Sequence, residues 1–174
     1  MIAESEIIEV TPLRRRHLRG VLRIERAVYS QPWSHGLFVS ELALRNTRTY
    51  FVARVGSKVV GYGGLMEATD EGHITTLAVD PEWTRRGIAT RLLISLFESA
   101  RSHGTADVTL EVRVSNLAAQ ACYRNFGFVP AGMRKNYYPD TKEDALIMWV
   151  HEVDTPAYGE RLESLAERLG PVSQ

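Results

Sequence analysis

The sequence lacks several features that would point to secretion or to nucleic-acid binding. It has one cysteine, Cys122, so no intrachain disulfide can form, which is typical of a reducing compartment. Lys+Arg number 21 and Asp+Glu also number 21, so the formal net charge is zero. Proteins that bind nucleic acid usually carry a basic excess that neutralises phosphates. We therefore expect no nucleic-acid partner.

Long hydrophobic runs and metal-binding spacings are also missing. The longest apolar runs, at 92–97 and 145–150, are far too short to span a bilayer. The start, at 1–6, is acidic and has no apolar stretch of the signal-peptide kind. The five histidines are scattered, without the short His/Cys/carboxylate spacing of zinc sites. These absences predict a soluble, cytoplasmic protein with no membrane contact and no metal.

What the chain does contain is the composition of one globular domain. It has 174 residues, of which 44% are hydrophobic and 24% charged, and this fits a single domain with its own core. Hydrophobic patterns occur in the order strand, two helices, three strands, helix, strand, helix, two strands. This order predicts an α/β fold in which helices flank one sheet.

The two ends of this pattern carry more specific predictions. A short strand over 7–10 is followed by Thr11-Pro12, which offers a helix start because proline is favoured at the first helical position. Near the other end, leucines recur at helical spacing over 159–169, after a break at Thr155-Pro156. We expect this amphipathic helix to pack on the same domain, because three turns are marginally stable alone in water.

The most informative segment is a strand that turns into arginines, a glycine and a strong helix. In order, it contains Leu77, Ala78, Val79, Arg85, Arg86, Gly87, Ile88, Ala89 and Thr90. The first amides of such a helix have no partner inside the helix and lie at the positive end of its dipole. The segment therefore suits a phosphate group. An ordinary basic helix start is the alternative.

A second glycine-rich segment does not form a phosphate loop. Gly61, Gly63 and Gly64 fail the G-x-G-x-x-G pattern, because Met66 stands where the third glycine belongs. The cluster also lies inside a predicted strand rather than before a helix. We interpret it as a β-bulge or as a place of close backbone packing.

A second strand-to-helix junction runs from Leu110 to Asn116, and its helix carries Tyr123 and ends before Gly127-Phe128. Together the two junctions resemble the GCN5-related N-acetyltransferase (GNAT) family, in which a strand, a basic loop and a helix bind the pyrophosphate of acetyl-CoA. One position departs from the family pattern: Thr84 stands where the family usually has Gln or Arg, three residues before the first glycine.

The resemblance covers 7–153 and implies the GNAT fold, a mixed and mostly antiparallel sheet flanked by helices. It implies an acetyltransferase domain over 1–153 and leaves 154–174 as a C-terminal extension that we expect to be helical. Acetyl-CoA is the implied co-substrate, and no metal is implied. We expect a monomer or a weak dimer.

Three strings are more specific than the glycine pattern. Pro32-Trp33-Ser34, the string 110–116 and Arg134–Pro139 are similar to those of family members that acetylate the N-terminal alanine of a small-subunit ribosomal protein. The resemblance therefore implies transfer of acetyl to the N-terminal α-amine of a protein. A small-molecule amine acetyltransferase, a lysine acetyltransferase and a non-catalytic acyl-CoA-binding module stay open as alternatives.

The resemblance also implies roles for single residues. Glu111 is the implied general base, and Tyr123 the implied acid that protonates the departing thiolate. Read from the residues alone, Glu111 could be a solvated strand residue and Tyr123 a core tyrosine. Trp33, Tyr137 and Tyr138 are candidate walls of a peptide groove.

The resemblance also implies which residues contact acetyl-CoA. The backbone of Leu77, Ala78 and Val79 would pair with pantetheine, as a strand edge pairs with a peptide. Asn116 would hydrogen-bond the pantetheine region or, alternatively, cap the helix that follows it. Cys122 is a competing nucleophile, which we interpret as a buried apolar residue because no histidine is near it in the sequence.

Overall fold

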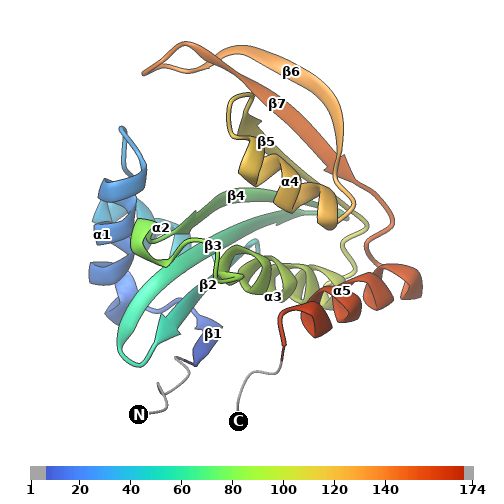
Figure 1. The fold of residues 1–174 in the computed structure, drawn as a ribbon, viewed down its shortest axis with the longest axis horizontal. Coiled ribbons are helices and arrows are strands. Elements are labelled where there is room, and N and C mark those ends of the chain that lie inside the picture. The colour runs from blue at the N-terminus through green and yellow to red at the C-terminus, as the bar shows by residue number, and fades with distance from the viewer. Residues whose placement is uncertain (1–6, 171–174) are drawn as a thin grey trace.

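The computed structural model describes residues 7–170, so positions 1–6 and the last four residues of the predicted extension lie outside it. It shows one seven-stranded sheet with helices on both faces, in the strand order β1-β2-β3-β4-β5-β7-β6 (Figure 1). The elements are β1 (Ile8–Pro12), the 3-10 helix η1 (Arg15–His17), α1 (Leu18–Val28), α2 (His35–Ala43), β2 (Arg48–Val55), β3 (Lys58–Ala68), β4 (Glu71–Val79), the 3-10 helix η2 (Pro81–Trp83), α3 (Ile88–Ser102), β5 (Asp107–Arg113), α4 (Leu117–Asn125), β6 (Val129–Tyr138), β7 (Glu143–Val150) and α5 (Pro156–Arg168).

The sheet is mixed and mostly antiparallel, as the predicted fold class requires. The parallel neighbours are β4 and β5, and they pair only over Glu71–His73 against Asp107–Thr109. Beyond His73 the two strands diverge, and residues 74–79 of β4 have no ladder partner on the β5 side within the described chain. A register shift at Gly64/Leu65 of β3 lies opposite this stretch, and such bulges increase local twist. The divergence opens the middle of the sheet.

The glycine cluster of β3 serves close packing, as interpreted from the sequence. A Cβ added to Gly64 would lie 2.7 Å from Cδ1 and 2.8 Å from Cζ of Tyr50. One added to Gly61 would lie 2.8 Å from Cγ2 of Ile88 on α3. These glycines therefore let a ring on one face and a helix on the other approach the backbone of β3.

The predicted helix start at Thr11-Pro12 is wrong. Pro12 is the last residue of β1, where it lies opposite Phe51 of β2. Proline is tolerated there because β1 is an edge strand with one neighbour. The backbone continues as a turn of 3-10 helix, and α1 begins only at Leu18.

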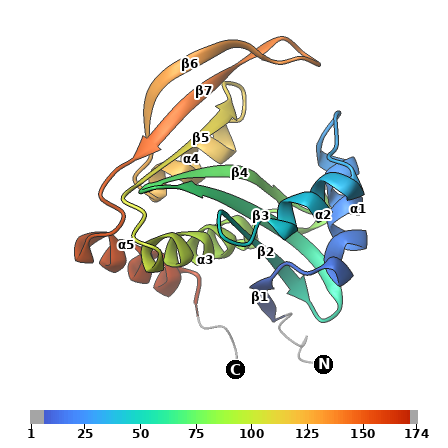
Figure 2. The same cartoon turned by 180° about the vertical axis from the view of Figure 1, so that it is seen from behind.

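Two helical layers sandwich the first half of the sheet. On one face, Val21 and Ile24 of α1 and Phe38 of α2 pack against Tyr50 and Val52 of β2, all of them buried. On the other face α3 runs across the sheet, with α5 beside it and α4 against β5 (Figures 1 and 2). The C-terminal end of α1 and the N-terminal end of α4 meet the diverging strands β4 and β5 on one side of the molecule, where the candidate site lies.

Candidate active site

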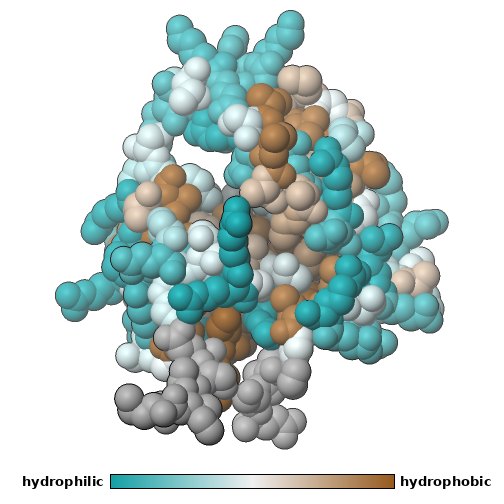
Figure 3. Space-filling view, in the orientation of Figure 1, coloured by the Kyte–Doolittle hydropathy of each residue, from teal (hydrophilic) through white to brown (hydrophobic). Residues whose placement is uncertain are grey.

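A cleft of about 710 Å³ lies where β4 and β5 diverge. The α1–α2 loop and the β6–β7 hairpin supply its other walls, and the space-filling view shows the opening below that hairpin (Figure 3). The structure brings all five predicted catalytic and substrate-binding residues together here. The site residues predicted from the sequence that line it are Trp33, Leu77, Glu111, Asn116, Tyr123, Tyr137 and Tyr138.

Glu111 faces this cleft from the middle of β5 and is paired there. Its Oε2 lies 2.6 Å from Nε2 of His73, and its Oε1 lies 3.4 Å from Nε of Arg134. The hydrogen bond with His73 is the main cause that holds the pKa of Glu111 below its ordinary value; burial acts in the opposite direction, and Arg134 adds to the lowering. The carboxylate is therefore ionised near neutral pH. With 12% of its side chain exposed, Glu111 is not a solvated strand residue.

Tyr123 enters the cleft from α4 and is buried apart from its access to that space. Only 8% of it is exposed, and its ring packs edge-on against Phe128 at a centroid distance of 5.8 Å. Burial is the main cause that raises the pKa of the Tyr123 phenol above its ordinary value. The hydroxyl therefore keeps its proton at neutral pH, as a general acid must before it acts.

Asn116 acts as a helix cap in the structure. Its Oδ1 accepts a hydrogen bond of 3.1 Å from the amide of Ala119, which satisfies one of the free donors at the start of α4. On the opposite wall, Leu77 accepts at its carbonyl a hydrogen bond of 3.1 Å from the hydroxyl of Tyr29. Ala78 is buried and does not line the cleft.

The predicted phosphate loop lies outside the cleft lining, at the start of α3. Gly87 is the N-cap of α3 with a φ of 72°, a left-handed conformation that favours glycine, and it has no side chain with which to cap the helix. The side chain of Ile88 is buried, so only its amide can face a ligand. Arg85 is exposed, and Arg86 stacks over the ring of Trp83 at 4.4 Å. The uncapped helix start and the adjacent cations fit a phosphate group.

An ion pair between the half-exposed Arg23 and the buried Asp80 holds the turn that leads into this loop, and sequence reasoning missed it. Oδ2 of Asp80 lies 2.6 Å from Nη1 of Arg23, and Oδ1 accepts a hydrogen bond of 3.0 Å from the amide of Glu82. Burial would raise the pKa of Asp80, but these two bonds outweigh it and lower the pKa. Asp80 thus fixes the direction in which the chain leaves β4.

Not every partly buried acid of the sheet and its helices faces the cleft. Glu41 binds Arg48 and Glu67 binds Thr105, and neither lines the cleft. The buried carboxylate of Glu25 lines it instead, accepting a hydrogen bond of 2.9 Å from the amide of Trp33. No spacing pattern signals Glu25, because its partners come from other elements of the fold.

A bridge closes one side of the cleft. The hydroxyl of Ser30, in the α1–α2 loop, donates a hydrogen bond of 2.6 Å to Oδ2 of Asp140 in the β6–β7 turn. Arg113 donates from Nη2 to both carboxylate oxygens of Asp140, at 3.1 and 3.0 Å, and lies 3.9 Å from the ring centre of Tyr138. Two segments far apart in the sequence are thus joined across the opening.

Comparison with known proteins identifies the family. A family model described as the acetyltransferase (GNAT) family matches residues 18–128. The chain belongs to this family. It is an acetyltransferase, and GNAT acetyltransferases use acetyl-CoA.

The relatives agree with this assignment. The [ribosomal protein bS18]-alanine N-acetyltransferase of Escherichia coli K12 is 35% identical over 141 residues, which cover 80% of this chain and 94% of the relative. The N-alpha-acetyltransferase RimI of Mycobacterium tuberculosis is 35% identical over 154 residues, covering 85% and 95%. A crystal structure of the ribosomal-protein-S18-alanine N-acetyltransferase from E. coli has a TM-score of 0.76 at 33% identity, covering 83% of this chain and 94% of that one.

The thiol of this acetyltransferase is not activated. Cys122 is half-buried on α4, and burial is the main cause that raises the pKa of its thiol. Its Sγ lies 4.0 Å from Oγ1 of Thr90, so α3 and α4 adjoin at this point. The environment agrees with a buried apolar residue rather than a nucleophile.

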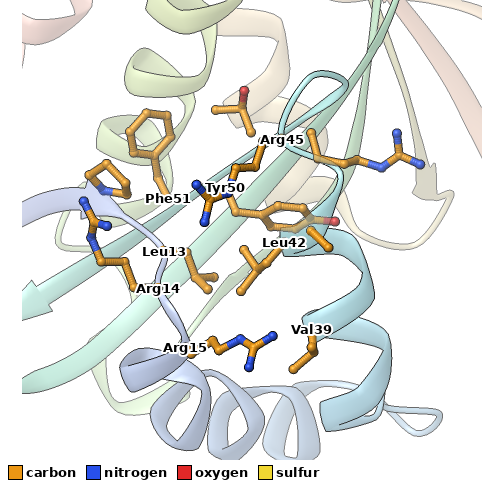
Figure 4. A pocket seen from close by; sticks show the side chains of 12 residues that line it. Leu13, Arg14, Arg15, Val39, Leu42, Arg45, Tyr50 and Phe51 are labelled. Carbon is orange, nitrogen blue, oxygen red and sulfur yellow. The ribbon is translucent and has the colours of Figure 1, made fainter.

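A second cavity of the acetyltransferase, of about 660 Å³, lies between β1, α2 and β2 (Figure 4). Arg14, Arg15 and Arg45 stand around a floor that includes Leu13 and Leu42. It shares no lining residue with the cleft and holds none of the predicted site residues. Within residues 7–170, no helix is long and apolar enough to cross a membrane, and no group of three or more His, Cys, Asp or Glu could hold a metal.

Proposed function

We propose that this acetyltransferase moves the acetyl group of acetyl-CoA to the N-terminal α-amine of a protein, with the N-terminal alanine of a small-subunit ribosomal protein as acceptor. The observation that carries the proposal is the Glu111–His73 pair, which faces the same cleft as the buried phenol of Tyr123. The substrate named for the E. coli relative supports the choice of acceptor.

The ionised carboxylate of Glu111 suits the removal of a proton from an α-amine. An N-terminal amine has an ordinary pKa of about 7.7–8.0, against about 10.4 for lysine, so a sizeable fraction is neutral near physiological pH. Where the amine is still protonated, Glu111 accepts a proton from it as a general base, either directly or through one water. His73 holds the carboxylate in one orientation by its hydrogen bond of 2.6 Å. The neutral amine then attacks directly, without a covalent enzyme intermediate.

The leaving side of the reaction requires a proton donor and a polarised carbonyl. Acetyl-CoA supplies the activated thioester when bound. Tyr123 holds a proton on its phenolic oxygen for the departing sulfur, because burial keeps this group neutral. The backbone groups of Leu77, Ala78 and Val79 lie on the open stretch of β4, where an amide can stabilise developing negative charge on the carbonyl oxygen. The start of α3 at Gly87 holds the pyrophosphate.

The side of the cleft that would bind the acceptor protein suits an extended N-terminal segment. Trp33 comes from the α1–α2 loop, and Tyr137 and Tyr138 come from the β6–β7 hairpin, so aromatic rings flank the entrance from two sides. The carboxylate of Glu25 and that of Glu111 lie in the same cleft and attract an incoming ammonium group. The Ser30–Asp140 bridge narrows the opening.

The test is an acetylation assay on a peptide panel, with the modified atom mapped by mass spectrometry. Peptides start with Ala, Gly, Ser or Met, and one has a blocked N-terminus and an internal lysine. We expect acetylation at the α-amine, fastest with alanine. Glu111→Gln and Tyr123→Phe should each lower kcat/KM by about 10²–10⁴-fold. Asp107→Asn, on the same strand as Glu111 but outside the cleft, should leave the rate near that of the wild type.

Two results would contradict the proposal. Acetylation of the blocked peptide at its lysine, with none at free N-termini, would assign the enzyme to side-chain amines. Unchanged kcat/KM in both Glu111→Gln and Tyr123→Phe would remove the catalytic roles given to these residues.

A further inference from the structure

Helix α5 lies beyond the stretch that the family model matches, yet it is docked firmly on the core. The side chains of Tyr158, Leu162 and Leu165 are buried in the cluster that also contains Phe97 of α3. The rings of Tyr158 and Phe97 lie 5.3 Å apart between centroids. In both ribbon views α5 runs beside α3 (Figures 1 and 2).

The first half of α5 is fixed to the end of α4. The hydroxyl of Tyr158 donates a buried hydrogen bond of 2.7 Å to the carbonyl of Phe126, the C-cap of α4. Arg161 donates from Nη1 to the carbonyl of Asn125 at 3.2 Å. The helix that carries Tyr123 is therefore held at its C-terminal end by α5.

The far end of α5 lies on the phosphate loop. Leu169, the C-cap of α5, covers the backbone of Gly87 so closely that a Cβ added there would lie 2.5 Å from its Cδ2. Nη2 of Arg91, one turn into α3, donates to the carbonyl of Leu169 at 3.4 Å. One helix thus contacts both the C-terminal end of α4 and the N-terminal turn of α3.

We infer that α5 is a brace for the cofactor site, and that Leu169 is a positioning residue that holds the Gly87 turn in its ligand-ready shape. The inference rests on the proposed placement of the pyrophosphate at the start of α3. Glycine in a left-handed turn has many other conformations open to it. A side chain packed on that turn restricts it before a ligand binds, and this lowers the loss of conformational entropy on binding.

The brace also has a geometric consequence for the two helices. Oγ1 of Thr90 on α3 and Sγ of Cys122 on α4 lie 4.0 Å apart, so the helices meet close to the phosphate loop. Since α5 contacts α4 at Phe126 and α3 at Gly87, it holds the C-terminal end of α4 and the N-terminal end of α3 in a fixed relation. Leu169 contacts the Gly87 turn, whereas Tyr158 and Arg161 hold α4, so loss of the Leu169 side chain changes cofactor affinity and leaves Tyr123 in place.

The experiment measures CoA binding to the full-length protein by titration calorimetry, without an acceptor peptide. Leu169→Ala should weaken CoA binding by about three- to tenfold, since one packed side chain is lost from the loop. KM for acetyl-CoA should rise by the same factor, while kcat at saturating acetyl-CoA and KM for the peptide stay unchanged. Leu169→Met, which refills the space above Gly87, should restore binding.

Leu165→Ala is the matched control, because it removes the same atoms from the same helix at a buried position in the core cluster. It should lower Tm while CoA affinity stays within twofold of the wild type. Wild-type affinity in Leu169→Ala, or an equal loss of affinity in Leu165→Ala, would overturn the positioning role. Because calorimetry needs no acceptor, an error in the proposed acceptor leaves this test intact, whereas a wild-type protein that does not bind CoA would overturn both proposals.

Discussion

Gly64→Ala is expected to destabilise the fold although it adds a single methyl group. The new Cβ would lie 2.7 Å from Cδ1 and 2.8 Å from Cζ of Tyr50, distances that folded proteins essentially never show. The ring cannot easily move away, because Tyr50 is buried and its hydroxyl donates a hydrogen bond of 2.8 Å to Glu41. Glu41 is itself held by Arg48 at 2.7 Å.

The magnitude follows from three contributions. Overpacking a tight core costs about 1–3 kcal/mol. Loss of the hydrogen bond between Tyr50 and the Glu41 carboxylate costs about 1.5–3 kcal/mol, because the acceptor is charged. Alanine restricts the unfolded chain more than glycine does, which offsets about 0.4–1 kcal/mol. The free energy of unfolding should therefore fall by about 2–5 kcal/mol, which lowers Tm by at least about 4 °C for a chain of this size.

The assay is thermal and urea unfolding beside a matched control. Gly132→Ala also places a methyl group on a strand glycine, but there the nearest atom, Cδ1 of Ile147, is 3.8 Å away. The control should unfold within about 0.5 kcal/mol of the wild type, as most surface substitutions do. Tyr50→Leu combined with Gly64→Ala should recover part of the loss, because the ring is gone. If Gly64→Ala proved as stable as Gly132→Ala, the close approach of Tyr50 to β3 would be refuted.

Two further predictions concern titratable groups. His73→Ala should raise the pKa of Glu111, because it removes the hydrogen bond that lowers it; carbon-13 NMR of the carboxyl carbon measures this, and an unchanged titration would exclude His73 as the cause. Asp80→Asn should reduce stability at pH 7, because the carboxylate that binds Arg23 and the amide of Glu82 is lost. Since the folded-state pKa of Asp80 is lowered, its contribution is present above the ordinary carboxyl pKa and disappears as the pH falls through the lowered value. Urea midpoints of wild type and variant should therefore converge in acid, and a constant gap would contradict this.

Local patterns in the sequence predicted the helix ends and most strands because they depend on near neighbours. Ser34 caps α2 by accepting a hydrogen bond from the amide of Leu37, and serine is one of the residue types that favour this position. The same logic failed at Pro12, because a proline that starts a helix and one that ends an edge strand look alike without the partner strand. Tertiary pairing decided between them.

The residues of the cleft could be predicted from the sequence only where they belong to a recognisable motif. Glu111 and Tyr123 lie in recognisable strings, and the structure places both in one cavity. His73 and Glu25 carry no such mark, because their importance comes from strands and loops that meet only after folding. A buried carboxylate or an imidazole is identified by its partners in space, and spacing along one chain cannot supply them.

The position of β7 between β5 and β6 makes the cleft depend on a late part of the chain. β5 has its antiparallel partner in the last strand to be made, Glu143–Val150, and β6 pairs with that same strand. A nascent chain that ends before residue 143 therefore exposes Glu111 on a bare sheet edge and has no closed cleft. The cleft therefore forms only after β7 has been made and has paired with β5 and β6.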